Sequence, residues 1–130
     1  MPKPPLDPEK VVIFSGAGLS APSGISTFRD PSGLWRRYRI EEVATPEAWT
    51  RQPHGVLEFY NERRANATAA QPNAGHQAIA DLERRFQVVV ITQNVDDLHE
   101  RAGSTQVIHL HGELRKARST SNRSLVYEIG

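Results

Sequence analysis

The sequence contains no cysteine, and this absence removes several kinds of site at once. None of the 130 residues is a cysteine. The chain therefore has no disulfide, no thiol nucleophile and no zinc site built from thiolates. A metal ion would need histidine or carboxylate ligands, and no spacing of these residues suggests such a site. We therefore expect no metal and, in particular, no zinc.

Long apolar runs and an excess of charge are also missing. No stretch approaches the roughly 20 apolar residues of a membrane-spanning helix. Residues 1–9 are proline-rich and polar where a secretory signal needs an apolar segment. Sixteen basic and fifteen acidic residues give a formal charge of +1, which provides no long-range attraction to nucleic acid or anionic lipid. We therefore expect a cytoplasmic protein that binds neither nucleic acid nor membrane.

Three short apolar runs dominate the rest of the sequence, at 11–14, 88–91 and 107–110. They are largely β-branched, which is typical of buried parallel strands. Helical patterns separate the runs, so the order of elements predicts an α/β fold with a Rossmann-like parallel sheet and crossover helices. Three strands make a narrow sheet, and the sheet is therefore expected to be incomplete towards the C-terminus.

Residues 1–130 are predicted to form a single, partial domain. Its residues 21–72 are expected to be an insertion, in which a long loop precedes helices at 46–51 and 53–67. Two further expectations concern helix ends: Asn73 could cap the next helix, and Gly103 should stop a short helix that begins at Val95. Beyond Gly112 the pattern weakens, with a turn-like segment and then a last apolar run.

Each of the three apolar runs ends at polar groups that can do chemistry. Ser15-Gly16-Ala17-Gly18 follows the first run, Gln93-Asn94-Val95-Asp96 the second, and His111-Gly112 the third. In open α/β sheets, ligands bind beyond the carboxyl ends of the strands. The three polar segments should therefore share one pocket, and we interpret the chain as part of an enzyme.

The glycine-rich segment from Gly16 to Ala21 fits the pattern G-x-G-x-x-A. In such a loop, glycines let backbone N–H groups approach a pyrophosphate at the start of a helix. A tight turn between strand and helix explains the same residues equally well. The acidic residue that usually ends a second strand about 20 residues later is not evident, so a dinucleotide site here would be atypical.

The remaining motifs also have two interpretations each. Phe28 could cover a reactive centre or anchor its loop in the core, and Arg29 could hold a phosphate or pair with Asp30. The polar groups at 93–96 could cap a helix or bind a carboxamide and a ribose. His111 could act as a general base, although a lone histidine is more often structural. His109 lies on the same strand face and could help to orient it.

Taken together, GAGLSAPSGISTFRD, TQNVDDLH and HLHGEL resemble the sirtuin family of NAD-dependent protein deacylases in their order and spacing. The resemblance runs from about Val11 to Lys116. It implies that His111 is the general base, acting through a ribose hydroxyl, and that Asn94 and Asp96 hold the nicotinamide amide. The other cofactor-binding residues that it implies are Gln93 at the nicotinamide ribose, Phe28 shielding the alkylimidate intermediate, Ala17, Gly18 and Arg29 at the phosphates and ribose, and also Gly16, Ser20 and Thr27.

The resemblance also implies the reaction and its partners. An acyl-lysine oxygen of a protein or peptide attacks the anomeric carbon of NAD, nicotinamide leaves, and the acyl group passes to ADP-ribose. Tyr60 and Arg63 resemble the Tyr-x-x-Arg pair that selects carboxylated acyl groups in one sirtuin class. A tyrosine hydroxyl and a guanidinium on one helix face can grip a carboxylate, although chance placement on a helix surface is an alternative. We therefore predict a preference for succinyl- or malonyl-lysine, with acetyl-lysine as a further substrate.

Two departures from the family bear on this expectation. Many sirtuins have a four-cysteine zinc site, and Ser119 stands where its first ligand would be. Family members also continue well past Gly130, with a loop that pairs with the substrate peptide and strands that bind the adenosine half of NAD. Two alternatives therefore remain beside a deacylase. The chain could be a truncated, non-catalytic fragment that binds nicotinamide or ADP-ribose, or it could be an ADP-ribosyltransferase.

Overall fold

A three-stranded parallel sheet forms the centre of the protein. The computed structural model describes residues 1–27 and 37–129. The sheet consists of β1 (Lys10–Ser15), β2 (Gln87–Thr92) and β3 (Val107–His109), in the order β1-β2-β3. β1 pairs with β2 in parallel along its whole length, and β2 pairs with β3 in parallel. The predicted α/β fold with a parallel sheet is therefore confirmed.

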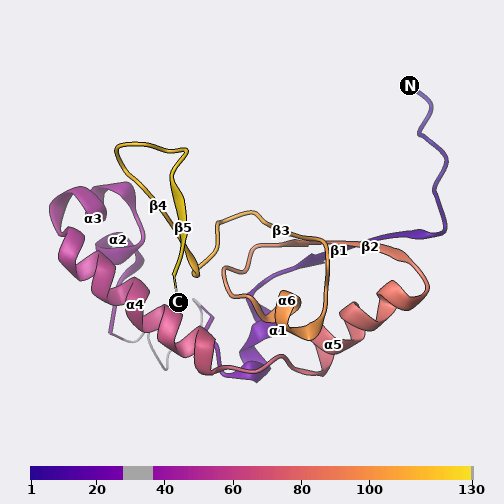
Figure 1. Cartoon of the computed structure of the whole chain (residues 1–130), viewed down its shortest axis with the longest axis horizontal. Helices are drawn as coiled ribbons and strands as arrows, with labels where there is room; N and C mark the ends of the chain where they lie inside the picture. Colours follow the sequence, from indigo (N-terminus) through magenta and orange to yellow (C-terminus); the bar gives the residue numbers. More distant parts are fainter. Residues whose placement is uncertain (28–36, 130) are drawn as a thin grey trace.

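Three helices lie on one side of this sheet: α1 (Ala17–Ser20), α5 (Ala74–Asp81) and α6 (Leu98–Ala102) (Figure 1). Both connections step in the same direction across the sheet, and right-handed crossovers then place their helices on the same face. A 3₁₀ turn at Ala21–Ser23 follows α1, and another at Leu82–Arg84 follows α5.

The predicted ends of these helices are largely correct. The Asn73 side chain accepts hydrogen bonds from the N–H groups of Gly75 and His76, and Gly103 ends α6 in the left-handed conformation with φ of 114°. α6 begins at Leu98 rather than at Val95. The reason is local, because the Asp96 carboxylate accepts the Leu98 N–H at 3.1 Å and makes a turn before the helix.

The strands are buried on one face only. Val88, Val90 and Thr92 of β2 point towards the helices and are at most 4% exposed. On the opposite face, Val12 and Phe14 of β1 are each 64% exposed. The expectation of buried strands is therefore correct for one side of the sheet and wrong for the other.

A second group of helices forms a lobe with its own small core. The lobe consists of α2 (Ile40–Val43), α3 (Pro46–Arg51) and α4 (Pro53–Ala69), the last two close to their predicted ranges. Phe59 is fully buried in this lobe and makes edge contacts with Tyr38 at 5.0 Å and Tyr60 at 5.2 Å between ring centroids. That residues 21–72 are an insertion into the sheet domain stays a prediction.

One arginine joins the helical lobe to the sheet. Arg101 of α6 donates to the carbonyl oxygens of Ala67 at 2.6 Å and Ala70 at 2.8 Å, at the C-terminal end of α4. A cation is favourable there because the last carbonyl groups of a helix have no partners within the helix. Asp97 holds the same guanidinium from the other side at 3.0 Å.

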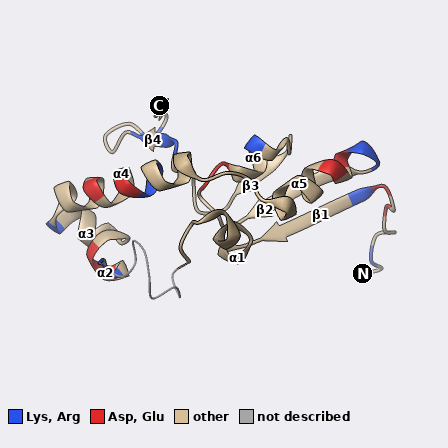
Figure 2. Ribbon diagram, turned by 90° about the horizontal axis from the view of Figure 1, so that it is seen from below, with Lys and Arg blue, Asp and Glu red and all other residues tan. Residues whose placement is uncertain are grey.

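The C-terminal part of the chain forms a small antiparallel hairpin. It consists of β4 (Lys116–Arg118) and β5 (Val126–Glu128), joined by the predicted turn. Asn122 builds this turn by accepting the N–H and hydroxyl of Ser124. Sequence analysis missed β4 because it is short, exposed and mostly polar. Along α4 in Figure 2 the acidic residues come before the basic residues. No helix among the described residues has the length and apolarity needed to cross a membrane.

α5 and α6 pack through two buried histidines. His76 and His99 are fully buried, with ring centroids 5.1 Å apart. Nδ1 of His76 accepts the Asn73 N–H, so this ring carries its proton on Nε2. Ser15 donates to Thr92, so Nε2 of His99 donates to the Ser15 hydroxyl oxygen at 2.9 Å. Burial lowers the pKa of both histidines.

These buried histidines predict a loss of stability in weak acid. The unfolded chain takes up protons at the ordinary histidine pKa of 6.5, whereas the folded protein resists protonation until the pH is lower. Below pH 6.5 the unfolded state therefore binds more protons, and the free energy of unfolding falls as the pH falls, by roughly 1.4 kcal/mol per pH unit for one such group. Above pH 6.5 this contribution is fully present.

The measurement is urea unfolding between pH 7.5 and 5.5. His99→Gln keeps an N–H donor towards Ser15 without a titrating ring, and it should flatten this pH dependence. His54→Gln is the matched control because the His54 side chain is 90% exposed, and it should leave the slope unchanged. Equal slopes for the unchanged chain and His99→Gln would contradict the assignment.

Candidate active site

Four of the predicted site residues form one buried polar cluster, where β1 and β2 end. The Ser20 hydroxyl donates to the Asp96 carboxylate at 2.9 Å. The Asn94 amide nitrogen donates to the Gly16 carbonyl at 3.0 Å and to the Ser20 hydroxyl at 3.3 Å. Ser20, Asn94 and Asp96 are all less than 9% exposed. We call Gly16, Ser20, Asn94 and Asp96 the polar cluster.

A second layer of hydrogen bonds supports the polar cluster from below. The Ser15 hydroxyl donates to the Thr92 hydroxyl at 2.8 Å, and Thr92 in turn accepts the backbone N–H of Asn94 at 3.0 Å. His99 donates to Ser15 from α6, as described above. Since each of these side chains is buried and has at least one hydrogen-bond partner, the network fixes the ends of both strands relative to each other.

His109 holds the polar cluster from the side of β3. Its Nδ1 donates to the Asn94 carbonyl at 2.7 Å, and its Nε2 lies 2.9 Å from the Glu100 carboxylate. Burial disfavours the charged ring, but the hydrogen bonds to Glu100 and Asn94 and the charges of Glu100 and Glu113 outweigh it and raise the pKa of His109. The side chain thus orients the Asn94 segment, where sequence analysis expected it to orient His111.

The glycine-rich loop has room for a ligand. A Cβ atom at Gly18 would meet nothing within 4 Å, whereas one at Gly16 would lie 3.2 Å from the Gln93 side-chain oxygen. Gln93 itself is exposed. The first N–H groups of α1 have no acceptor within that helix. The loop therefore has an open backbone at Gly18 and an exposed amide beside Gly16.

A cavity of 430 Å³ opens next to the polar cluster. Tyr60 and His111 both line it, from α4 and from the turn after β3. Val95, which lies between Asn94 and Asp96 in the sequence, forms part of its wall and accepts the Leu114 N–H at 2.9 Å. The other lining residues are Trp49, Val56, Leu57, Arg64, Glu113, Leu114, Lys116, Ala117, Arg118 and Thr120.

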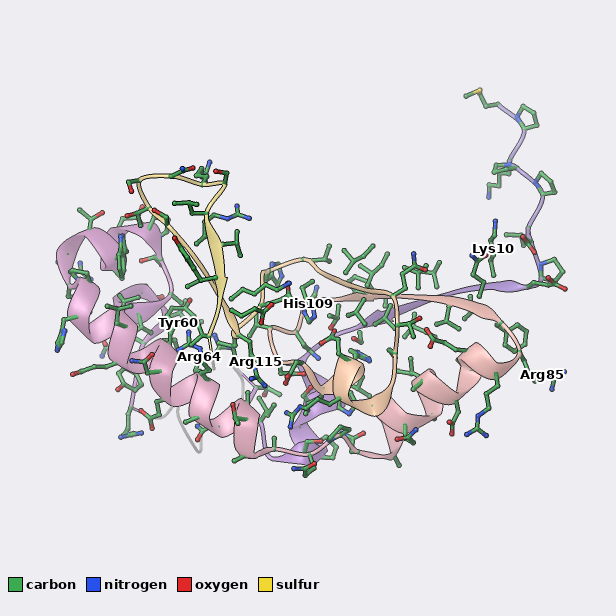
Figure 3. All side chains as sticks on the ribbon, in the orientation of Figure 1. Lys10, Tyr60, Arg64, Arg85, His109 and Arg115 are labelled. Atoms are coloured by element: carbon green, nitrogen blue, oxygen red, sulfur yellow. The ribbon has the colours of Figure 1, made fainter. Side chains whose placement is uncertain are left out.

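Two arginines, Arg64 and Arg118, line this cavity. Sequence analysis paired Tyr60 with Arg63 instead. Figure 3 shows Tyr60 and Arg64 on α4. Arg115, from the segment between β3 and β4, is drawn close to them. Arg64 donates to the Leu114 carbonyl at 2.6 Å and to Asn61 at 2.8 Å. Arg63 instead lies over the rings of Phe59 and Tyr60, 5.6 and 5.8 Å from their centroids. Burial lowers the pKa of Arg63, against the opposing effects of Tyr60 and Asp96.

Four other predicted site residues make no contact with the polar cluster that the structure describes. Ala17 and Thr27 are half-buried at the start of α1 and after the 3₁₀ turn. Phe28 and Arg29 lie outside the described residues, so their roles stay predictions. Within residues 1–27 and 37–129, no group of three or more histidine, aspartate or glutamate side chains could hold a metal ion.

Comparison with known proteins gives close relatives among bacterial enzymes. An NAD-dependent protein deacylase of Helicobacter pylori (strain ATCC 700392 / 26695) is 56% identical over 119 residues, which cover 92% of this chain and 52% of that protein. Another, of Aggregatibacter actinomycetemcomitans, is 61% identical over 109 residues, covering 84% of this chain and 52% of that protein. The chain thus spans about half the length of these relatives.

Solved structures share the same arrangement. A complex of a Sir2 homologue with ADP-ribose has a TM-score of 0.82 and 52% identity, and the match covers 92% of this chain and 48% of the other. A Sir2 homologue–NAD complex has a TM-score of 0.81 and 52% identity, with 92% and 46% covered. The family model described as "Sir2 family" matches residues 16–128, a range that contains the whole polar cluster and every residue that lines the cavity. The chain belongs to the Sir2 family, as the resemblance to the sirtuins predicts.

Proposed function

We propose that this chain takes part in NAD-dependent deacylation of protein lysines, in which the acyl group passes to ADP-ribose and nicotinamide is released. One observation carries the proposal: His111 and Tyr60 line the same cavity, and Val95 connects this cavity with the polar cluster. A general base and an acyl-lysine subsite therefore adjoin a site that can hold an amide and a ribose. The two relatives above are both named NAD-dependent protein deacylases.

The residues divide the work by their chemistry. Asn94 and Asp96 present an amide and a carboxylate, which together match the acceptor and donors of a carboxamide such as that of nicotinamide. His111 lies exposed at the cavity, where an imidazole can take a proton from a ribose hydroxyl. The open backbone at Gly18 would receive the phosphates and ribose of NAD, together with Gly16, Ala17, Ser20, Thr27, Gln93 and Arg29. Phe28 would shield the alkylimidate intermediate.

The acyl group is proposed to enter between α4 and the segment that follows β3. Tyr60 contributes a hydroxyl and Arg63 and Arg64 contribute guanidinium groups, a set suited to a succinyl or malonyl carboxylate. The substrate would be an acyl-lysine protein or peptide. A solved relative at 31% identity and a TM-score of 0.77 contains a deacetylated p53 peptide and 3′-O-acetyl ADP-ribose. A cytoplasmic location stays a prediction.

Replacing His111 should slow the reaction strongly. With NAD and an acetyl- or succinyl-lysine peptide, mass spectrometry should detect deacylated peptide and O-acyl-ADP-ribose. His111→Ala should lower the rate by about 10²–10⁴-fold, the usual contribution of a general base. His54→Ala, which changes an exposed histidine outside the cavity, should leave the rate unchanged. An acceptor modified with ADP-ribose would favour ADP-ribosyl transfer, and folded chain that binds ADP-ribose without forming product would favour a non-catalytic fragment.

Acyl selection should depend on Tyr60 and on one of the two arginines. Tyr60→Phe and Arg63→Gln should each raise KM for a succinyl peptide by roughly 10–100-fold, because each removes a hydrogen bond to a charged group. KM for the acetyl peptide should change little. Arg64→Gln is the matched comparison, and its effect decides whether the lining arginine or its neighbour grips the carboxylate. Equal losses on both peptides in every variant would contradict a role in selection.

A further inference from the structure

His109, the last residue of β3, has an acceptor beside each of its ring nitrogens. Its Nδ1 lies 2.7 Å from the Asn94 carbonyl oxygen, and its Nε2 lies 2.9 Å from the Glu100 carboxylate. The side chain is only 6% exposed, so water is largely kept away from both contacts. In a neutral imidazole one nitrogen has no proton and is itself an acceptor. Since a carbonyl oxygen and a carboxylate both accept, the geometry fits a ring with a proton on each nitrogen.

The charged groups around His109 favour this second proton. Glu100 comes from α6, whereas Glu113, in the segment between β3 and β4, lies 4.0 Å from the same nitrogen and pairs with Lys116 at 3.0 Å. His99 of α6 is buried, and burial lowers its pKa, so it adds no opposing charge at neutral pH. The neighbouring strand β2 has no charged residue. Burial also opposes a charge on His109, but the hydrogen bonds and the two carboxylates outweigh it and raise its pKa.

The contact with His109 completes the set of bonds that hold Asn94. The Asn94 backbone N–H donates to the Thr92 hydroxyl at 3.0 Å, and its carbonyl accepts from His109. Its side-chain nitrogen donates to Gly16 and Ser20. The side-chain oxygen receives no hydrogen bond from any residue that the structure describes. Asn94 is therefore fixed at three points, and its amide oxygen is the acceptor left for an N–H group of a ligand.

We propose that His109 is a positioning residue: its doubly protonated ring ties the Asn94 segment to Glu100 of α6 and so directs the Asn94 amide oxygen towards the carboxamide of a bound nicotinamide. This inference rests on the proposed function, in which Asn94 and Asp96 hold that carboxamide. His109 is not among the residues that line the cavity. It acts on the ligand only through Asn94, from a place near the middle of the molecule (Figure 3).

A positioning role of this kind makes ligand binding depend on pH. Below the ordinary histidine pKa of 6.5 the ring is charged and both contacts are intact. Because the pKa of His109 in the folded chain is raised, the proton leaves only at a higher pH. One nitrogen then becomes an acceptor that faces another acceptor, and the Asn94 segment loosens. Affinity for nicotinamide should therefore fall as the pH rises, whereas a general base such as His111 works better as it loses its proton.

The charge on the ring can be tested without any ligand. In the 130-residue chain labelled with ¹⁵N, nuclear magnetic resonance between pH 6 and 9 should show both His109 nitrogens protonated at the acid end. The backbone amide signals of Asn94, Val95 and Asp96 should shift with the same midpoint as the His109 ring. A ring that is neutral over the whole range would overturn the proposal, and so would amide signals that stay still while His109 titrates.

The effect on the site can be measured with nicotinamide itself as the probe. Its Kd for the unchanged chain should rise roughly 3–10-fold between pH 6.5 and 9, as expected for the loss of one hydrogen bond to a charged group. Glu100→Gln keeps an acceptor but removes a carboxylate, so it should move this rise to a lower pH. His109→Gln keeps an N–H donor towards Asn94 without a titrating ring, and its Kd should not depend on His109 protonation. Its curve should therefore be flat.

His54→Gln is the matched control, because it replaces an exposed histidine on α4. It should reproduce the pH dependence of the unchanged chain, and circular dichroism should show all variants folded. A histidine that only stabilised the fold would give His109→Gln the same slope as the unchanged chain, and that result would overturn the proposal. Shared titration of His109 and the Asn94 amide without nicotinamide binding at any pH would support the positioning role and count against the proposed function instead.

Discussion

The hydrogen bond between Ser15 and Thr92 is the interaction on which the site depends. It joins the last residues of β1 and β2 at 2.8 Å, and both side chains are buried. Each of these residues precedes one of the functional segments, the glycine-rich loop after Ser15 and the Asn94 segment after Thr92. His99 completes the link from α6. A buried hydroxyl pair of this kind allows one arrangement, because any shift of a strand would leave a polar group without a partner.

Two basic side chains also link separate elements of the fold. His109 is held between the Asn94 carbonyl and the Glu100 carboxylate, behind the segment that carries Asn94 and Asp96. These hydrogen bonds raise the pKa of His109. Arg101 serves a comparable purpose between the lobes, since it bonds to the carbonyl groups at the end of α4 while Asp97 neutralises it. In both cases a basic side chain from one element bonds to carbonyl oxygens of another, which fixes distant parts of the chain with few residues.

Strands and helix caps could be predicted because they follow from local patterns. The first two polar segments meet in the polar cluster, as expected. Among the described residues, the cavity is lined by the second and third segments but not by residues 15–18. The β-branched runs, the Asn73 cap and the Gly103 stop each depend on a few adjacent residues. Which of Arg63 and Arg64 lines the cavity could not be predicted, because residues three and four positions after Tyr60 both lie on its face of the helix. The partner of His109 was equally hidden, since its contact with Asn94 spans fifteen residues of sequence. Exposure of one sheet face depends on what else packs there, which composition does not record.

The helical lobe has a consequence for how such a protein can diversify. α4 contributes Tyr60 and Arg64 to the cavity, yet it is stabilised by a separate core around Phe59 and reaches the sheet mainly through Arg64 and Arg101. The polar cluster and its supporting network contain no residue of α4. Substitutions along α4 can therefore accumulate without disturbing the strand ends. The two lobes can evolve at different rates, so that the wall of the cavity could change along one helix while the polar cluster is inherited intact.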